Sequence, residues 1–358
     1  MAWPKDTPTS HDPVLERAYA HCAHLLTRHA RSFALAARFL PAVRRGDVYV
    51  LYAFCRTVDD LADGPQAGAS PSDALAALQD WRRWLLTGSP ADPDDPVKYA
   101  LAHVRRTHDL PLRPLLDLLD GLCADVVPRH LPDARALDEY CYRVAGTVGL
   151  VMAPLLGTRD ATALACARDL GIAMQLTNVL RDVGEDLGRG RIYLPAAEMA
   201  RYGYGRVDLE RGVIDARFVA LMRHYIARAR RYYAGGLAGV GLLPGESRVG
   251  IALAAHAYAG ILSAIERAAY DVFTQRAHLG RWDKLRLVAR LRLGHPLWAA
   301  PRRAGALNGT EEWPYLAVDA SFPGDAPAAQ DPPGRAKADP GQQRHGDRAE
   351  RGIVIGMS

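Results

Sequence analysis

The sequence lacks the cysteine pattern of a disulfide-stabilised or zinc-binding protein. Its 358 residues include five cysteines, an odd number, and no Cys-x-x-Cys pair. They are Cys22, Cys55, Cys123, Cys141 and Cys166. Isolated cysteines of this kind are typical of a cytosolic protein whose thiols are reduced and mostly buried.

Long hydrophobic runs are also missing. No apolar segment of the kind found in a signal peptide follows the N-terminal residues Met-Ala-Trp-Pro-Lys-Asp. The longest weakly apolar stretch, 249–265, is rich in Ala and contains His256. It is too short and too poor in large apolar side chains to indicate a membrane span, so it predicts a buried helix. We therefore expect a cytoplasmic protein.

Charge of one sign is not concentrated anywhere in the chain. The formal net charge is +5 and the isoelectric point is about 9.0, but the arginines are scattered along helix-like segments. There is no RNA-binding or zinc-finger signature, so no nucleic-acid partner is expected. The mild positive charge favours anionic substrates or the anionic face of a membrane.

Segments that alternate with period two are scarce, which argues against β-sheet and for an all-α fold. From residue 13 to about 300, breaks at Gly and Pro indicate roughly ten helices joined by short loops. Residues 301–358 contain seven Pro and eight Gly and too little apolar surface to offset the entropy of ordering. The expected organisation is a disordered leader at 1–12, an all-α domain at 13–300 and a disordered tail at 301–358.

Two short acidic clusters stand out against this apolar, helical background. The first is 59–63 (Asp-Asp-Leu-Ala-Asp), directly before Gly64-Pro65. On a helix Asp59 and Asp63 lie one turn apart and point the same way, and Arg56 lies one turn earlier. Acidic residues at a helix C-terminus oppose the macrodipole, so their placement needs an explanation other than a solvated helix end.

The second cluster is 182–186 (Asp-Val-Gly-Glu-Asp). Gln175, Asn178, Asp182 and Asp186 are spaced three, four and four residues apart, which predicts one narrow polar stripe on a single helix. Short amides and carboxylates suit specific ligand contacts. The next segment, 188–195 (Gly-Arg-Gly-Arg-Ile-Tyr-Leu-Pro), breaks the helix and supplies two arginines, which pair well with phosphate oxygens.

Carboxylates are rarely buried unless their charge is compensated. Two acidic clusters facing one cavity would repel each other, and divalent cations remove that repulsion. An Mg²⁺ ion that is coordinated by carboxylates and keeps open coordination positions is suited to binding a phosphate or diphosphate. The two clusters together therefore predict a divalent-metal site, although either one alone is more often a solvated helix end.

Four segments of the chain resemble the squalene/phytoene synthase family, the head-to-head trans-isoprenyl diphosphate synthases. They are 29–33 (His-Ala-Arg-Ser-Phe), 52–63, 140–149 (Tyr-Cys-Tyr-Arg-Val-Ala-Gly-Thr-Val-Gly) and 175–195, with a weaker fifth at 257–273. The resemblance covers about residues 15–292. It implies a single-domain, all-α isoprenoid synthase bundle around a central cavity, with both acidic motifs facing each other at its mouth.

The resemblance also implies roles for individual residues. The metal ligands would be Asp59, Asp63, Asn178, Asp182 and Asp186, and the four aspartates, with the aromatic side chains of Phe33 and Tyr258, would be catalytic. Substrate contacts would come from Arg31, Ser32, Tyr52, Arg56, Tyr140, Gly149, Gln175, Asn178, Arg181, Arg191 and Tyr193. Glycine at 149 suits close approach to a lipid chain, but helix packing explains it equally well.

The likeness is greater to the phytoene-forming than to the squalene-forming branch of the family. It implies condensation of two geranylgeranyl diphosphates to phytoene via prephytoene diphosphate, with Mg²⁺, or Mn²⁺ as a substitute, and without NADPH. The alternative is a squalene- or dehydrosqualene-type synthase that joins farnesyl diphosphates via presqualene diphosphate. Substrate chain length depends on cavity depth, which one sequence does not reveal.

The hydrophobic substrate and product favour peripheral association of the protein with a membrane surface. Contact with other enzymes of carotenoid synthesis is also expected. Two further classes of protein stay open. Residues 59–63 also satisfy the Asp-Asp-x-x-Asp pattern of chain-elongating prenyltransferases and terpene cyclases, but segments 140–149 and 181–186 argue against both. A non-catalytic scaffold relative would be free to lose its aspartates, whereas both motifs here are complete.

Overall fold

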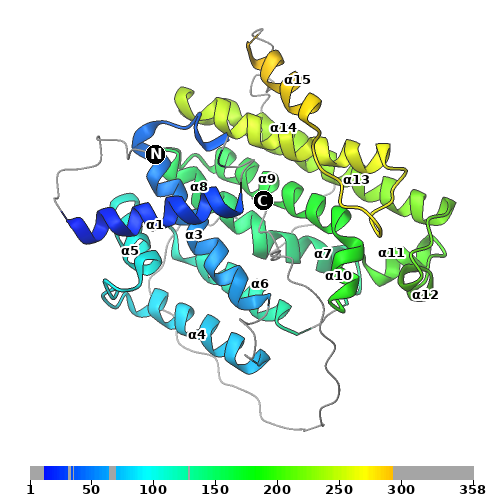
Figure 1. The fold of residues 1–358 in the computed structure, drawn as a ribbon, viewed down its shortest axis with the longest axis horizontal. Coiled ribbons are helices and arrows are strands. Elements are labelled where there is room, and N and C mark those ends of the chain that lie inside the picture. Colours follow the sequence, from blue (N-terminus) through cyan, green and yellow to red (C-terminus); the bar gives the residue numbers. More distant parts are fainter. Residues whose placement is uncertain (1–11, 31–33, 35, 64–69, 128–129, 293–358) are drawn as a thin grey trace.

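The computed structural model describes residues 12–30, 34, 36–63, 70–127 and 130–292 (Figure 1). Within these ranges there is no β-strand, only an isolated bridge between His130 and Ile192, which confirms the all-α prediction. The expected tail at 301–358 and most of the leader lie outside the described residues. Asp12, which we had placed in the leader, is the N-cap of the first helix and accepts hydrogen bonds from two backbone amides there.

Helices of very different lengths follow one another, with one π-helix (η1) and one 3₁₀-helix (η2) among them. They are α1 (Pro13–His29), α3 (Ala42–Ala62), α4 (Pro71–Thr87), α5 (Pro96–His108), α6 (Leu112–Asp125), α7 (Ala134–Cys141), η1 (Tyr142–Gly146), α8 (Thr147–Leu155), α9 (Ala161–Arg181), α10 (Val183–Gly188), α11 (Ala196–Arg201), α12 (Arg206–Glu210), α13 (Ala216–Ala238), η2 (Gly239–Leu242), α14 (Gly245–Arg267) and α15 (Arg281–Arg292). The expectation of roughly ten helices was too low, because α10, α11 and α12 are short helices within a region expected to be broken by Gly and Pro.

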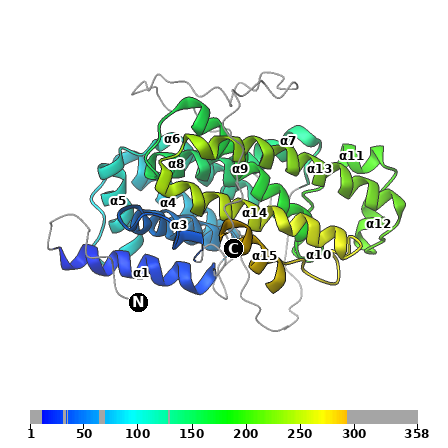
Figure 2. The same cartoon turned by 90° about the horizontal axis from the view of Figure 1, so that it is seen from above.

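The helix α9 lies at the centre of the bundle (Figures 1 and 2). It packs against α8, α13, α14 and η1. The helix α3 is surrounded by α1, which precedes it in the chain, and by α4, α5, α6 and α8, which follow it. These two central helices, α3 and α9, each end at one of the acidic motifs. The fold therefore places both motifs at the C-terminal ends of its most enclosed helices.

Glycines allow α9 to approach its neighbours closely. A Cβ atom at Gly171 would lie 2.2 Å from the carbonyl oxygen of Ala145, and one at Gly149 would lie 2.1 Å from the carbonyl oxygen of Ala167. Both obstacles are backbone atoms, which cannot rotate aside as a side-chain end can. Gly149 is thus required by the packing of α8 on α9, one of the two roles expected for it.

The predicted polar stripe does not lie on one continuous helix. The helix α9 ends at Arg181 and α10 begins at Val183, with Asp182 between them at φ −104° and ψ 16°. Loop 268–280 packs into this break: the amide of Gly184 donates to the carbonyl of Val272 at 3.1 Å. A Cβ atom at Gly184 would lie 2.7 Å from the Cα atom of Phe273, so the motif needs glycine there.

By length and composition, α14 is the one helix among the described residues that could cross a membrane. However, 56% of its most apolar window is buried inside the protein, and it packs against α9 and α13. A buried core helix explains this apolar composition, as expected for 249–265.

The close contact between η1 and α9 generates a stability prediction. Gly171→Ala should lower the free energy of unfolding by about 1–3 kcal/mol, because the new methyl group meets backbone atoms of η1 that must move. Urea unfolding followed by circular dichroism measures this. Gly245→Ala is the control, since a Cβ atom there meets nothing within 4 Å; equal stability of the two variants would contradict the close approach.

Candidate active site

The first acidic motif combines a buried carboxylate with a helix cap. Asp59 is only 1% exposed, and neither of its carboxylate oxygens accepts a hydrogen bond from the described residues. Burial, reinforced by the neighbouring charge of Asp63, raises the pKa of Asp59 well above its usual value. Asp63 caps α3. A buried carboxylate without hydrogen bonds is costly, so this end of α3 is suited to a compensating cation.

The second motif is held by arginines. Arg181 Nε and Arg276 Nε donate to Oδ1 of Asp182 at 2.8 and 2.7 Å. Burial opposes ionisation of Asp182, but the hydrogen bonds and charges of the two guanidinium groups outweigh it, so its pKa is lowered. For Asp186, burial and then the charge of Asp182 raise the pKa well above its usual value. Within one motif, the pKa of one carboxylate is therefore lowered and that of the other is raised.

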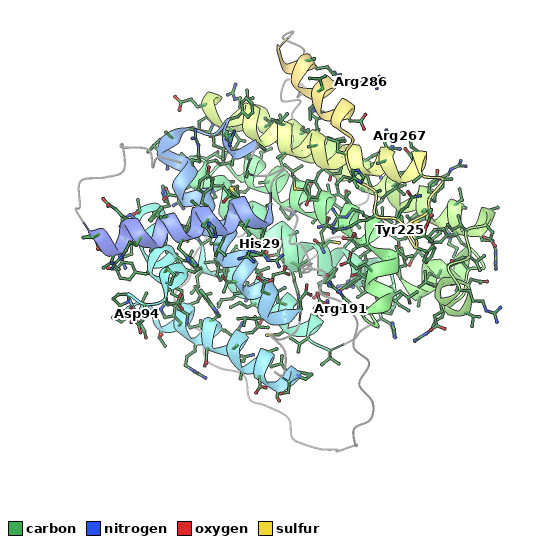
Figure 3. The ribbon with its side chains drawn as sticks, in the orientation of Figure 1. His29, Asp94, Arg191, Tyr225, Arg267 and Arg286 are labelled. Carbon is green, nitrogen blue, oxygen red and sulfur yellow. The ribbon has the colours of Figure 1, made fainter. Side chains whose placement is uncertain are left out.

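The two motifs face each other across arginines that follow α10. Arg189 Nη1 lies 3.4 Å from Asp63 Oδ2, and its Nη2 lies 3.1 Å from Glu185 Oε1. Arg191, labelled in Figure 3, donates from Nη1 to Asp63 Oδ1 at 2.8 Å and from Nη2 to the carbonyl oxygen of Asp125 at 3.0 Å. Residues more than 120 positions apart in the sequence are thus joined at one end of the bundle.

The carboxylates of the two motifs form ion pairs with arginines and do not converge as a set of metal ligands. Among the described residues, no three Asp, Glu, His or Cys side chains converge closely enough to hold a metal ion. The predicted ligands, Asp59, Asp63, Asn178, Asp182 and Asp186, are therefore not gathered around one point, because guanidinium groups hold Asp63 and Asp182. The oxygen donors still fit Mg²⁺, which keeps several waters and takes substrate phosphates as ligands, and the buried oxygens of Asp59 are suited to it.

Four of the predicted contact residues form a buried chain beside the motifs. The rings of Tyr140 and Tyr193 are stacked with centroids 4.6 Å apart. Gln175 Nε2 donates to the Tyr140 hydroxyl at 3.4 Å, and Asn178 Nδ2 donates to Gln175 Oε1 at 3.2 Å. Burial raises the pKa of both tyrosines well above the usual value, so this chain presents neutral hydroxyl and amide groups.

The other predicted residues divide into three groups. Tyr52 and Tyr258 are buried, and the Tyr258 hydroxyl interacts with the guanidinium of Arg181. Arg56 donates from Nε to Asp60 Oδ2 at 3.1 Å, and its charge also interacts with that of Asp59. The remaining three, Arg31, Ser32 and Phe33, lie outside the described residues.

Sequence reasoning missed Arg276 and Asp125, and it noted Arg189 only as one of two arginines suited to phosphate. Arg276 reaches Asp182 from loop 268–280, and Arg189 joins the two motifs. Asp125, at the end of α6, is 1% exposed and close enough to contribute to the raised pKa of Asp59. Nothing in the sequence sets Asp125 apart from the other two aspartates of α6, and an arginine in a distant loop carries no periodic signal.

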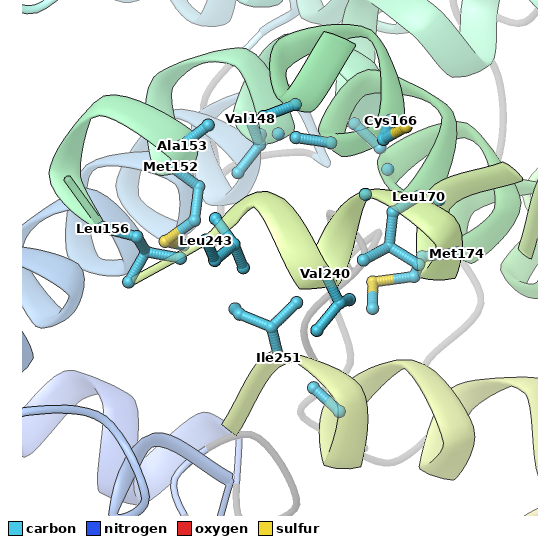
Figure 4. Close-up of a pocket in the computed structure, with 18 residues that line it drawn as sticks. Val148, Met152, Ala153, Leu156, Cys166, Leu170, Met174, Val240, Leu243 and Ile251 are labelled. Atoms are coloured by element: carbon cyan, nitrogen blue, oxygen red, sulfur yellow. The ribbon is translucent and has the colours of Figure 1, made fainter. Parts of the chain in front are cut away.

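An apolar cavity lies along α9 (Figure 4). It encloses about 770 Å³ of space including its opening, and its walls come from α8, α9, η2 and α14. Between Ala163 and Met174, α9 lines the cavity, while Gln175 and Asn178 on the same helix begin the polar region. The arrangement matches a molecule with an anionic head and a long apolar tail.

The helical bundle, the opposed acidic motifs and the apolar cavity together define an isoprenoid synthase fold. Residues 26–283 match the squalene/phytoene synthase family, and the chain belongs to that family. It is 37% identical to the 15-cis-phytoene synthase of Synechococcus elongatus over 283 residues, which are 76% of this chain and 91% of the relative. It is 38% identical to the phytoene synthase of Thermus thermophilus over 264 residues, 74% of this chain and 89% of the relative.

The crystal structure of a dehydrosqualene synthase in complex with a ligand is 33% identical to this chain, with a TM-score of 0.72. The match covers 78% of this chain and 97% of that one. The likeness therefore extends across nearly the whole of the solved structure, which confirms the fold expected from the four motif segments.

The buried Asp59 generates a prediction for the metal-free protein, kept so with a chelator. Asp59→Asn should raise the urea concentration at mid-unfolding at neutral pH, because it removes a buried charge that no described residue satisfies. The raised pKa of Asp59 means that the folded state holds a proton that the unfolded state releases. Wild-type stability should therefore fall as pH rises from about 4, the unfolded value, towards the folded value, and the advantage of the variant should grow over that interval.

Asp60→Asn is the matched control, because the Asp60 side chain is 48% exposed on the same helix. It should show no such gain with pH. Lower stability of Asp59→Asn than of wild type at neutral pH would show that the carboxylate is satisfied in the folded protein.

Proposed function

We propose that the protein joins two geranylgeranyl diphosphates head to head to form phytoene. One observation carries the proposal: two acidic motifs and their arginines face each other at the polar end of α9, and the same helix lines an apolar cavity. The relatives named phytoene synthase support the choice of product. The reaction passes through prephytoene diphosphate, and each of its two stages releases one diphosphate and one proton.

The chemistry requires charge stabilisation at one place and exclusion of water at another. Loss of diphosphate from an allylic carbon leaves an anion and a carbocation. In this proposal Arg181, Arg191 and Arg276 bind the departing diphosphate through charge-assisted hydrogen bonds. The aspartates of both motifs, with Asn178, would hold a divalent cation, Mg²⁺ or Mn²⁺, and the cation would supply neutralisation of the diphosphate charge.

The organic half of the substrate would lie against apolar and aromatic side chains. The walls of the cavity exclude water, which would otherwise capture the carbocation. Tyr52 and Tyr258 lie at the boundary between the arginines and the core, close enough to each other to interact, and an aromatic face stabilises a cation by roughly 0.5–2 kcal/mol. We assign Tyr140, Gln175, Asn178 and Tyr193 to positioning the diphosphate end, since their buried chain adjoins both motifs.

A squalene- or dehydrosqualene-type reaction with farnesyl diphosphate is the second candidate. The likeness to a solved dehydrosqualene synthase supports it. The two candidates use the same polar end of the site and differ in the length of tail that the cavity must hold. Phytoene formation needs no reductant, whereas squalene formation consumes NADPH.

We also propose that the all-α unit, residues 13–300, works at the cytoplasmic surface of a membrane, where neighbouring carotenoid enzymes would take up its product. The support is chemical: the substrate tail and the hydrocarbon product partition into lipid. Recovery of all the protein in the soluble fraction after gentle lysis would count against it.

Product analysis tests the reaction. With Mg²⁺, the wild-type protein should convert geranylgeranyl diphosphate to phytoene, and NADPH should change neither rate nor product. Asp182→Asn should lower the rate by about 100-fold or more with unchanged helical content by circular dichroism, whereas Asp60→Asn should stay near wild type. Turnover of farnesyl diphosphate alone, or full activity of Asp182→Asn, would contradict the proposal.

The far end of the cavity tests the chain length. Ala163 lies about 27 Å along α9 from Arg181, taking about 1.5 Å per residue, and Ala163→Phe would fill space there. The variant should lose turnover of geranylgeranyl diphosphate more than turnover of farnesyl diphosphate. Ala161→Phe is the control, because Ala161 is exposed on the same turn of helix. An unchanged ratio of the two rates in Ala163→Phe would show that the tail lies elsewhere.

A further inference from the structure

Arg189 occupies an unusual place between the two acidic motifs. Its guanidinium reaches Asp63 Oδ2 at 3.4 Å with one nitrogen and Glu185 Oε1 at 3.1 Å with the other. These carboxylates belong to different motifs and are separated by more than 120 residues in sequence. One side chain therefore holds the end of α3 to α10.

The contacts of Arg189 are weaker than those of its neighbour Arg191. The Arg191 side chain is 8% exposed, and it binds Asp63 Oδ1 at 2.8 Å and two backbone carbonyls. The Arg189 side chain is 30% exposed, and ion pairs at that level of exposure contribute little stability. The contact of Arg189 with Asp63 is thus longer and more exposed than that of Arg191.

The segment around Arg189 is rich in glycine, and its backbone is tied to α10 by hydrogen bonds from the amides of Arg189 and Arg191 to the carbonyl oxygen of Asp186. Gly188 and Gly190 flank Arg189, Gly190 has φ +75°, and a Cβ atom at Gly188 would meet nothing within 4 Å. Glycine on both sides gives this segment more backbone freedom than other residues would. Because the Arg189 side chain is partly exposed, rotation about its own bonds can carry the guanidinium away from the carboxylates.

We propose that Arg189 is an electrostatic latch, which takes the place of the divalent cation between Asp63 and Glu185 and leaves it when a metal–diphosphate complex enters. The inference rests on the proposed function, because it concerns metal and diphosphate binding at the same site. It explains why no described trio of acidic side chains forms a metal cage while the oxygen donors suit Mg²⁺. The latch keeps the motifs together without metal and makes binding of metal alone unfavourable.

Binding of Mn²⁺ to the purified protein without any diphosphate tests the latch directly. Electron paramagnetic resonance counts free Mn²⁺ during a titration, so turnover is not needed. Arg189→Gln should bind Mn²⁺ roughly fivefold or more tightly than wild type, the range expected for coupling between sites. Arg189→Lys keeps the charge but lacks the fork that reaches both carboxylates, so its Mn²⁺ affinity should lie closer to that of Arg189→Gln than to wild type.

Arg206→Gln is the matched control, because Arg206 makes the same i, i+4 contact with Glu210 on an exposed surface. It should bind Mn²⁺ as wild type does. Unchanged affinity in Arg189→Gln, wild-type affinity in Arg189→Lys, or equal tightening in Arg206→Gln would each overturn the latch. A protein that binds Mn²⁺ as expected but does not convert geranylgeranyl diphosphate would keep the latch and refute the proposed function.

Discussion

Compensation of buried negative charge is the constraint on which this site depends. Asp59 and Asp63 lie at the end of α3, Asp182 lies between α9 and α10, and Asp186 lies in α10. Ionised carboxylates are costly in such buried positions unless they are paired. Guanidinium groups pair with Asp63 and Asp182, whereas the pKa values of Asp59 and Asp186 are raised. In the proposed function, binding of metal and diphosphate and release of the latch would each exchange one compensating charge for another.

The helix α9 links that charge compensation to the organic chemistry. Its first half lines the apolar cavity and its last turns carry the amides and Arg181. Close packing through Gly149 and Gly171 fixes its distance from η1 and α8. A substrate laid along this helix would have its anionic head and its apolar tail placed by one rigid element, so the departing charge and the carbocation would be handled at fixed positions relative to each other.

Much of the fold followed from local pattern, and long-range contacts explain what did not. The all-α class, the end of α3 at Asp63 and the buried helix at 249–265 were predictable because periodicity and breakers are local signals. The break at Asp182 was not, because it is imposed by loop 268–280 through Gly184. The same holds for Arg276, which lies 94 residues from its partner.

The most direct measurement is the anomalous scattering of Mn²⁺ in crystals grown with a non-hydrolysable geranylgeranyl diphosphate analogue. The account predicts manganese peaks between the ends of α3 and α10, ligated by aspartates of both motifs and by the diphosphate, with the Arg189 side chain withdrawn from Asp63. A diphosphate bound by arginines alone, with no manganese between the motifs and Arg189 still on Asp63, would contradict it.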